Sequence, residues 1–508
     1  MSWLTRSLHW RPEIGRTARG WRGDHAGLSA AAVMIVALAM GVGVAMLLAI
    51  GQWKLAAPLT GLLVAPVLFA LLIRHLDGRS DALFWLALVA AFSSSFILAT
   101  TKVDLRFVLE LVVYAAAPLL FARLLPHLKR SAHLKWLLVF GLAFLALSVV
   151  ATLTGRSRSL PALYTMVYNV KPFVMLGFGA CLVWSSTTER RYLLIVRWAW
   201  LLFLATAILQ WSAPSVYTAI LSDFKAEQHP FFAGMSRAKT VFHHPALAAT
   251  VASALAIVCA ARWAERRSVS DALAIGGYFA VVLMAGQRHE LVALLATFIF
   301  VGLLWRYPMR LGSLLVSSVL VGVVTIAVLY PLLNETIDRE LVAWGIVGRG
   351  MDPENIRAVL YQDASRVAER YFPWGSGLGT FGSAGAMRYD LSLYFEMGYQ
   401  HFWWFGKQSV LMDAFWTRYI AETGWLGLTL MVAIYALTLQ RALGWIADAE
   451  QGTRERFYSV CGCGGLIFLL IASPTSFGLA EPLQGLLPLV PLGVAWNLRR
   501  QRLAQARE

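Results

Sequence analysis

Residues 134–152 read LKWLLVFGLAFLALSVVAT, an apolar stretch in which Lys135 is the single charged residue. A helix needs about 20 predominantly apolar residues to cross the hydrocarbon core of a bilayer, so this stretch predicts a transmembrane helix. Similar blocks recur along all 508 residues, of which 58% are hydrophobic and 14% are charged. A soluble domain would carry roughly 25% charged residues. The sequence therefore predicts an all-α, polytopic integral membrane protein.

The number of apolar blocks sets the expected number of spans at about 12–14 transmembrane helices. If the chain starts in the cytoplasm and crosses at each block, more than half of its 44 Lys and Arg fall in cytoplasmic segments. This is the distribution that the positive-inside rule describes. Residues 1–27 and 499–508 are then cytoplasmic tails, the first of them basic. The expected spans, with approximate edges, are 28–50, 54–73, 81–100, 104–123, 134–152, 169–186, 192–211, 243–262, 271–287, 289–305, 311–333, 414–440, 459–474 and 481–498.

Three connections on the outer side are longer than a turn. Two of them, 153–168 and 212–242, lie within the region 28–333, which holds the first eleven expected helices. The third is a large loop at 334–413, which precedes the last spans at 414–498. Only this loop is long enough to form a structure of its own.

The large loop contains two readable segments. PENIRAVLYQDASRVAERY has apolar residues at helical spacing and charges on the other face, so it predicts an amphipathic helix on the outer surface. FPWGSGLGTFGS at 372–383 follows it and lacks the Lys-Ser/Thr of a phosphate-binding loop. Alternating glycines, Gly377 and Gly379 among them, favour positive φ and close backbone approach. We expect a tight turn beneath a substrate cavity.

Composition argues against several other classes of protein. The net charge of +16 is explained by the positive-inside distribution, so no nucleic-acid partner is expected. The four cysteines all fall in apolar segments, which indicates neither a disulfide framework nor a cysteine-rich metal site. His243, His244 and His289 are possible metal ligands, but no further His or Cys stands at ligand spacing from them. No metal and no cofactor are expected.

Cationic side chains gather where positive charge is disfavoured, at the outer ends of spans. Arg237 precedes the eighth expected span, with Lys239, His243 and His244 beside it. Arg288 sits at the tip of a very short hairpin, where Asn or Gly would make a better turn. A guanidinium at headgroup depth can give two parallel hydrogen bonds to a phosphate. Interfacial snorkelling is the alternative explanation for such arginines.

Intramembrane charge is scarce by comparison. Glu110 and Glu290 are the clear cases inside expected spans, and neither has an evident partner in the sequence. Ionisable residues within the bilayer usually mark ion pathways or proton relays. Two isolated carboxylates make a weak case for a transporter and favour chemistry at the outer membrane surface.

The densest aromatic region follows the glycine run. Its rings fit either an interfacial belt or a stacking surface for sugars, with Trp403 and Trp404 at its centre. His401 and Asp413 are candidate general bases beside it, as are Asp390 and Glu396. The aromatic residues in question are Tyr389, Tyr394, Phe395, Tyr399, Phe402, Trp403, Trp404, Phe405 and Trp416.

Four stretches between 237 and 430 resemble the O-antigen ligase and Wzy-type polysaccharide polymerase superfamily of bacterial inner-membrane enzymes. They are RAKTVFHHPALAATV, GQRHELVALLATF, the segment from Arg357 through PWGSGLGTFGS, and DAFWTRYIAETGWLGL. The resemblance implies a GT-C-like fold and a metal-independent, inverting glycosyltransferase whose active site faces the periplasm. The donor would be an undecaprenyl-diphosphate-linked oligosaccharide. Membrane lipids are further partners, and a chain-length regulator or export proteins are candidate ones.

The resemblance also implies roles for single residues. Arg237 and Arg288 match the arginines that hold the diphosphate, in agreement with the reading from charge. Asp413 stands where a ligase carries a catalytic His, which favours a polymerase of exopolysaccharide or O-antigen repeat units. Asp413 or His401 would activate the acceptor hydroxyl.

Other residues are expected to help position the glycan. They are Lys171, Arg357, Arg366, Trp403, Trp404, Gly377 and Gly379. The alternative activities are an O-antigen ligase that transfers the glycan to lipid A core or protein, and a lipid-linked glycan transporter.

Overall fold

The structure is a computed structural model, and the residues it describes are 84–90, 92–93, 108–114, 120, 131–182, 184–220, 230–232, 235–307, 309–320, 322, 355–406 and 408–506. The expected tail 1–27 and the expected spans 28–50 and 54–73 lie outside these residues. Within them the regular secondary structure is helical except for a two-stranded ribbon, β1 (Pro230–Phe232) and β2 (Met235–Ser236).

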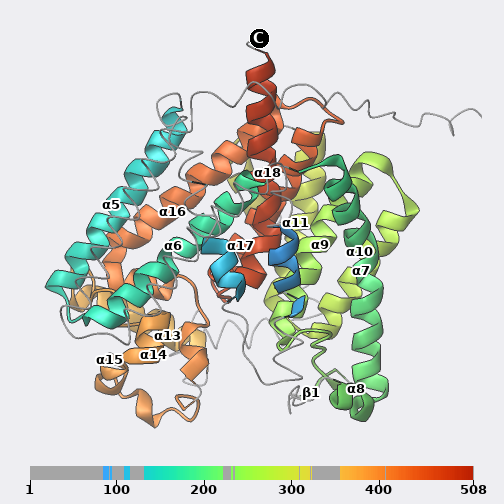
Figure 1. Ribbon diagram of the computed structural model, residues 1–508. Coiled ribbons are helices and arrows are strands. Elements are labelled where there is room, and N and C mark those ends of the chain that lie inside the picture. The colour runs from blue at the N-terminus through green and yellow to red at the C-terminus, as the bar shows by residue number, and fades with distance from the viewer. Residues whose placement is uncertain are drawn as a thin grey trace, which may run out of the picture. The chain divides into compact units, whose positions relative to one another are not determined.

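Six helices in the described part are long and apolar enough to cross a membrane. This confirms an all-α, membrane-embedded protein. The six are α5 (Ala132–Thr154), α7 (Ser186–Ser212), α9 (Pro245–Arg266), α11 (Arg288–Arg306), α16 (Thr417–Asp448) and α17 (Arg454–Ala472), all visible in Figure 1.

Four further helices occupy other expected spans or parts of them. They are α6 (Ser159–Cys181), α10 (Val269–Ala285), Leu311–Leu320 and α18 (Pro482–Gln505). The expectation that 153–168 is a connection is wrong for most of its length, because α6 begins at Ser159. Pro161 falls in the first turn of α6, where proline is tolerated. The helix therefore extends well above the apolar run that was expected to start at 169.

Glycines allow α17 and α18 to pack closely at the centre of the helices (Figure 1). A Cβ on Gly462 would overlap the backbone of Leu492, and one on Gly465 would overlap the carbonyl of Pro488. Gly179 of α6 meets Val490 of α18 in the same way. Small residues at helix contacts are the usual means of close packing in membranes, where hydrophobic burial adds little. These contacts join α6, α17 and α18.

Polar contacts divide the helix ends into two groups. One group lies near Arg288, where α11 begins, and the other lies near Arg306, where α11 ends. At the Arg306 end, Arg454 pairs with Glu189, and Arg499 pairs with Asp448 at 2.6 Å. Each of these pairs joins helix ends that lie on the same side of the membrane if successive spans run in opposite directions.

A lobe of short helices covers the Arg288 end of the spans. The predicted amphipathic helix is confirmed as α13, which buries its apolar face against this lobe and packs on α16. Its N-cap is Asn355, whose side chain accepts from the N–H of Ala358 at 3.3 Å. The lobe elements are α13 (Ile356–Arg370), α14 (Ala384–Tyr389), α15 (Ser392–Glu396), η2 (Tyr399–His401) and η3 (Gln408–Met412).

Helix α16 bends sharply near its start. Gly424 has φ 66 and ψ −175, which separates a first piece, residues 417–423, from the long remainder of the helix. Two carbonyls at this bend, those of Ala421 and Glu422, accept hydrogen bonds from the glycine run, as described below.

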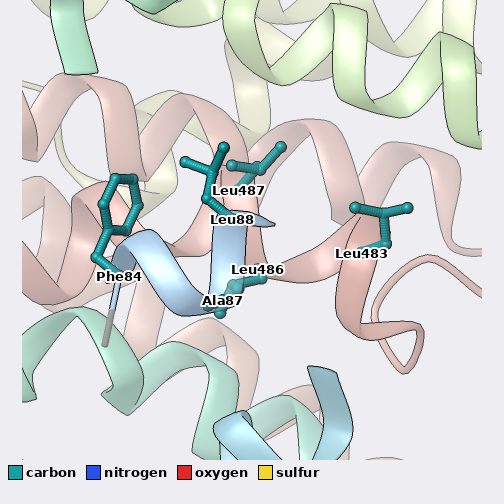
Figure 2. Close-up of a pocket in the computed structure, with 6 residues that line it drawn as sticks. All are labelled: Phe84, Ala87, Leu88, Leu483, Leu486 and Leu487. Atoms are coloured by element: carbon teal, nitrogen blue, oxygen red, sulfur yellow. The ribbon is translucent and has the colours of Figure 1, made fainter. Parts of the chain in front are cut away.

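Helical residues 84–90 pack against α18 around a small apolar void (Figure 2). Its volume is about 10 Å³, which is close to the space of one water molecule. The void is a packing defect between helices and too small for a sugar. Six side chains line it: Phe84, Ala87, Leu88, Leu483, Leu486 and Leu487.

Candidate functional site

Arg237 lies in a short connection that is tied to neighbouring helices. Its carbonyl accepts a hydrogen bond from the Gln210 side chain of α7 at 3.0 Å. The next N–H, that of Ala238, donates to the carbonyl of Met284 in α10 at 2.9 Å. The guanidinium Nε of Arg237 is buried and has no hydrogen-bond partner in the described part of the chain. Leaving a buried donor unpaired costs free energy, so this side chain is suited to an acceptor from a ligand.

Arg288 begins α11 immediately after a tight hairpin. Gly286 ends α10 with φ 64, and Arg288 is exposed at the first position of the next helix. The N-terminus of a helix carries partial positive charge and free N–H groups, which favour an anion. Arg288 adds a full charge to that end of α11.

Arg357 of α13 connects the hairpin to the start of α16. Its NH1 lies 3.2 Å from Nε2 of His289, and its NH2 lies 3.5 Å from Oδ2 of Asp413. Its Nε is buried without a hydrogen-bond partner among the described residues. Arg357 was expected only to help place a glycan, whereas the structure puts it in direct contact with the candidate base.

The charges around this point form one cluster, here called the arginine cluster. It consists of Arg237, Arg288, Arg357, His289, Glu290 and Asp413. Arg357 and Arg288 act electrostatically on His289, while Arg357, Arg237 and Asp413 act on the buried Glu290. Three guanidinium groups face two carboxyl groups, so the cluster has a positive balance. A diphosphate would complement it.

Asp413 combines proximity to this charge with access to solvent. Its side chain is 45% exposed, and Arg357 contacts one carboxylate oxygen. The other candidate base, His401, is exposed at the end of η2, and its recorded polar neighbour is Gln400 at 3.4 Å. Among the described residues, His401 makes no recorded contact with the arginine cluster. Asp413 is therefore the better placed of the two.

The glycine run is held against three helices. The N–H groups of Ser376 and Gly377 donate to the carbonyls of Ala421 and Glu422 at 2.9 and 3.0 Å. The Glu422 carboxylate accepts from the N–H groups of Thr380 and Phe381 and from the Ser383 hydroxyl, at 2.9, 3.1 and 2.5 Å. A buried carboxylate thus fixes the loop to the first piece of α16.

The predicted positive φ values are confirmed for both glycines that were singled out. Gly377 has φ 92 and Gly379 has φ 77. A Cβ on Gly377 would lie 2.8 Å from Cβ of Ser157, and one on Gly379 would overlap Pro161 of α6. Both glycines are buried, so they position α6 and α16 instead of touching a glycan.

Most of the aromatic region is the hydrophobic core of the lobe. Trp404, which was expected to help place a glycan, is 1% exposed and stacks on Phe402 with ring centroids 4.9 Å apart, so its ring is part of this core. Tyr394 and Tyr399 are also fully buried. A small lobe needs large apolar side chains to form a core, and aromatic rings supply that area. Trp403 differs, with 67% of its surface exposed.

Two other expected placement residues have different surroundings. Lys171 is fully buried in α6, where its ammonium pairs with Glu110 at 2.6 Å. The expectation that Glu110 is isolated is therefore wrong, and the reason is that a buried ammonium needs a counter-charge. Arg366 pairs with Asp363 on its own helix at 3.0 Å. Burial raises the pKa of the Asp363 carboxyl, while the charge of Arg366 opposes the rise.

Sequence reasoning gave no role to Glu422 and Arg418, and it considered His289 only as a metal ligand. His289 and Glu422 have the contacts described above. Arg418 is 1% exposed, with the rings of Phe415 and Phe477 at 4.5 and 4.9 Å. Its Nε and NH1 have no hydrogen-bond partner in the described part. The signal that could have drawn attention to Arg418 is an arginine one turn after Asp413 within an apolar run.

Comparison with known proteins adds no family. No protein-family model matches the chain, and no curated protein matches its sequence.

Proposed function

We propose that the protein is a glycosyltransferase of the bacterial inner membrane that polymerises undecaprenyl-diphosphate-linked oligosaccharide repeat units at the periplasmic face. The observation that carries the proposal is the bridge by Arg357 between His289 and Asp413, with Arg237 and Arg288 beside it. This arrangement supplies cations for a diphosphate and a carboxylate for a hydroxyl within one cluster.

The proposed reaction needs two events at one sugar carbon. The acceptor hydroxyl oxygen forms a bond to the anomeric carbon of the donor while the bond from that carbon to the diphosphate oxygen breaks, with inversion. Asp413 accepts the hydroxyl proton, as a general base within hydrogen-bond reach does. The arginines stabilise the charge that develops on the departing diphosphate.

The position of Asp413 favours a polymerase over a ligase. Burial raises the pKa of the Asp413 carboxyl, which strengthens it as a proton acceptor, while the charge of Arg357 opposes the rise. Asp413 can therefore serve in the place of an imidazole. The acceptor in a polymerase is the end of another lipid-linked glycan, and no lipid A core or protein acceptor is needed.

The test is transfer by the purified protein in nanodiscs, with polyprenyl-diphosphate-linked oligosaccharide and separation of the products by length. We expect a ladder of longer lipid-linked glycans. Arg288→Gln should reduce the rate about 10²–10³-fold, the usual effect of removing one charge-stabilising donor. Asp413→Asn should reduce it about 10²–10⁴-fold, the range for a general base. Arg306→Gln, at the opposite end of α11, is the matched control and should leave the rate unchanged.

Each other outcome has a distinct meaning. Donor consumption only after addition of lipid A core or a protein would indicate a ligase. Full activity in Asp413→Asn with loss in His401→Gln would move the base to His401. Passage of the lipid-linked glycan across a liposome bilayer without any donor consumption would indicate a transporter and overturn the proposal.

A further inference from the structure

An aromatic series runs along α6 from the surface of the lobe towards the start of α16. The ring of Tyr389, at the end of α14, lies 5.4 Å from that of Tyr164, which lies 5.3 Å from that of Tyr168. Phe477, in the connection between α17 and α18, follows at 6.3 Å from Tyr168. These four rings are here called the aromatic track.

The track is built by the glycine run, which presses α6 against α14. A Cβ on Gly385 of α14 would overlap Pro161 and Thr165 of α6, and the Thr165 hydroxyl lies 3.1 Å from that of Ser383. Tyr164 and Tyr168 are four residues apart, so they lie on one face of α6. The close contact between α6 and α14 brings Tyr389 to the same face.

The track is accessible, unlike the aromatic core of the lobe. Tyr389 is 37% exposed, and Tyr164, Tyr168 and Phe477 are each half-buried. Tyr164 and Tyr168 lie in the part of α6 that precedes residue 169, where the apolar span was expected to begin. Surface therefore remains on each member for a ligand.

Cations flank the rings along their length. The guanidinium carbon of Arg388 lies 5.8 Å from the Tyr164 ring and 5.7 Å from the Tyr389 ring, and Arg388 is exposed. No carboxylate pairs with Arg388 among the described residues. The Lys171 ammonium lies 3.5 Å from the Tyr168 ring, and the Arg418 guanidinium lies 4.9 Å from the Phe477 ring.

The inner end of the track lies beside the segment that carries the candidate base. The ring of Phe477 lies 6.5 Å from that of Phe415, which is two residues from Asp413. The N–H of Phe415 donates to the carbonyl of Ser473 at 3.3 Å, which fixes the two connections together. A ligand on the track would thus approach Asp413 from the side of α6.

We propose that the aromatic track binds the pyranose rings of an oligosaccharide and leads it to Asp413. Pyranose rings present C–H faces that pack on aromatic rings, and their polar groups can bond to the exposed guanidinium of Arg388. A lipid chain would use the apolar rings alone and would make no use of Arg388. The identity of the ligand as a glycan rests on the proposed function. Arg388, which has no paired carboxylate, predicts a preference for sugars that carry an acidic group.

The test measures binding without turnover, in full-length protein in nanodiscs. Saturation-transfer NMR would be recorded with two soluble probes, maltoheptaose and an oligogalacturonate of the same length. We expect saturation at the ring C–H protons of both probes. Tyr168→Leu should weaken binding about tenfold, the typical cost of truncating an aromatic anchor. Tyr168→Phe should retain it, and Arg388→Gln should weaken the acidic probe more than the neutral one.

Tyr307→Leu is the matched control, since Tyr307 is an exposed tyrosine beside a cation, Arg306, and follows the end of α11 that lies opposite Arg288. Equal loss in this variant, unchanged binding in Tyr168→Leu, or no saturation with either probe would overturn the inference. So would displacement of the probes by polyprenyl alcohol in the nanodisc, which would assign the track to a lipid chain. Thermal unfolding of each variant separates loss of the site from loss of the fold.

The two proposals fail separately. Oligosaccharide binding on the track of a protein that transfers no glycan would leave the track standing and overturn the proposed function. If the protein transfers glycan, but the track variants bind oligosaccharide normally and make products of normal length, the proposed function stands and the track proposal is overturned.

Discussion

Arg357 contacts both the hairpin that bears Arg288 and the segment that bears Asp413. A planar guanidinium presents several donors in fixed directions, so one side chain serves both neighbours. An ammonium is a point charge on a flexible stem and cannot hold both at once. The difference between these two cations makes the role of Arg357 testable.

Arg357→Lys keeps the charge and removes the bridge. We expect it to lower the rate of glycan transfer nearly as much as Arg357→Gln, because geometry as well as charge is lost. The measurement is the steady-state rate at saturating donor. Arg366→Lys on the same helix is the control, since Arg366 pairs only with Asp363. Near-normal activity of Arg357→Lys would show that charge alone suffices.

How far single residues were predictable depended on their sequence surroundings. Arg237 and Arg288 were recognisable because isolated cations at the outer ends of spans are unusual. The pairing of Lys171 with Glu110 was not, because the two residues are far apart in the chain and belong to different helices. Trp403 and Trp404 are adjacent, yet one is exposed and the other is core, a difference that only the fold of the lobe decides.

At the scale of elements, the glycine run acts as a joint between α6, α14 and α16. The sequence predicted its positive φ values, because only glycine takes them without strain. Its partners could not be predicted, since the Glu422 carboxylate that holds it lies on a helix 39–42 residues further along. The start of α6 was not predicted either, because its first turns lack the long apolar run that indicates a membrane-spanning helix.

Gly379→Ala should destabilise this joint. The substitution places a Cβ against Pro161 at a residue with φ 77, so both the overlap and the backbone cost act together. We expect a loss of about 1–3 kcal/mol in the free energy of unfolding. Thermal unfolding in detergent would measure it as a lower Tm. Gly141→Ala in α5, where a Cβ meets nothing within 4 Å, is the control and should leave stability equal or higher.

The spans in the part of the chain that the structure describes alternate in direction, and the polar contacts group their ends accordingly. The lobe and the arginine cluster lie at the Arg288 end, and the pairs of Arg454 and Arg499 lie at the other. More than half of the Lys and Arg fall in the expected cytoplasmic segments, and Arg306 lies in one of these segments. The positive-inside rule therefore predicts that the Arg288 end faces away from the cytoplasm.

Cysteine labelling tests this orientation. Arg366 is exposed in the lobe, and Gln451 is exposed between α16 and α17. In intact cells, a membrane-impermeant maleimide should label Arg366→Cys, and it should label Gln451→Cys only after permeabilisation. The natural Cys259, Cys461 and Cys463 are buried and should stay silent. The reverse pattern would place Asp413 in the cytoplasm and remove the proposed periplasmic reaction.

The bend at Gly424 affects how the protein responds to the thickness of its bilayer. The 32 residues of α16 would span about 48 Å if straight, against a hydrocarbon core of about 30 Å. The first piece, which carries Arg418 and follows Asp413, is hydrogen-bonded to the glycine run, and only the remainder has to match the lipid. Changes in lipid chain length would then be absorbed by tilt of the long piece. Because the first piece stays fixed, we expect hydrophobic mismatch to have little effect on the reaction. Transfer rates should therefore be nearly equal in nanodiscs of short-chain and long-chain phosphatidylcholine.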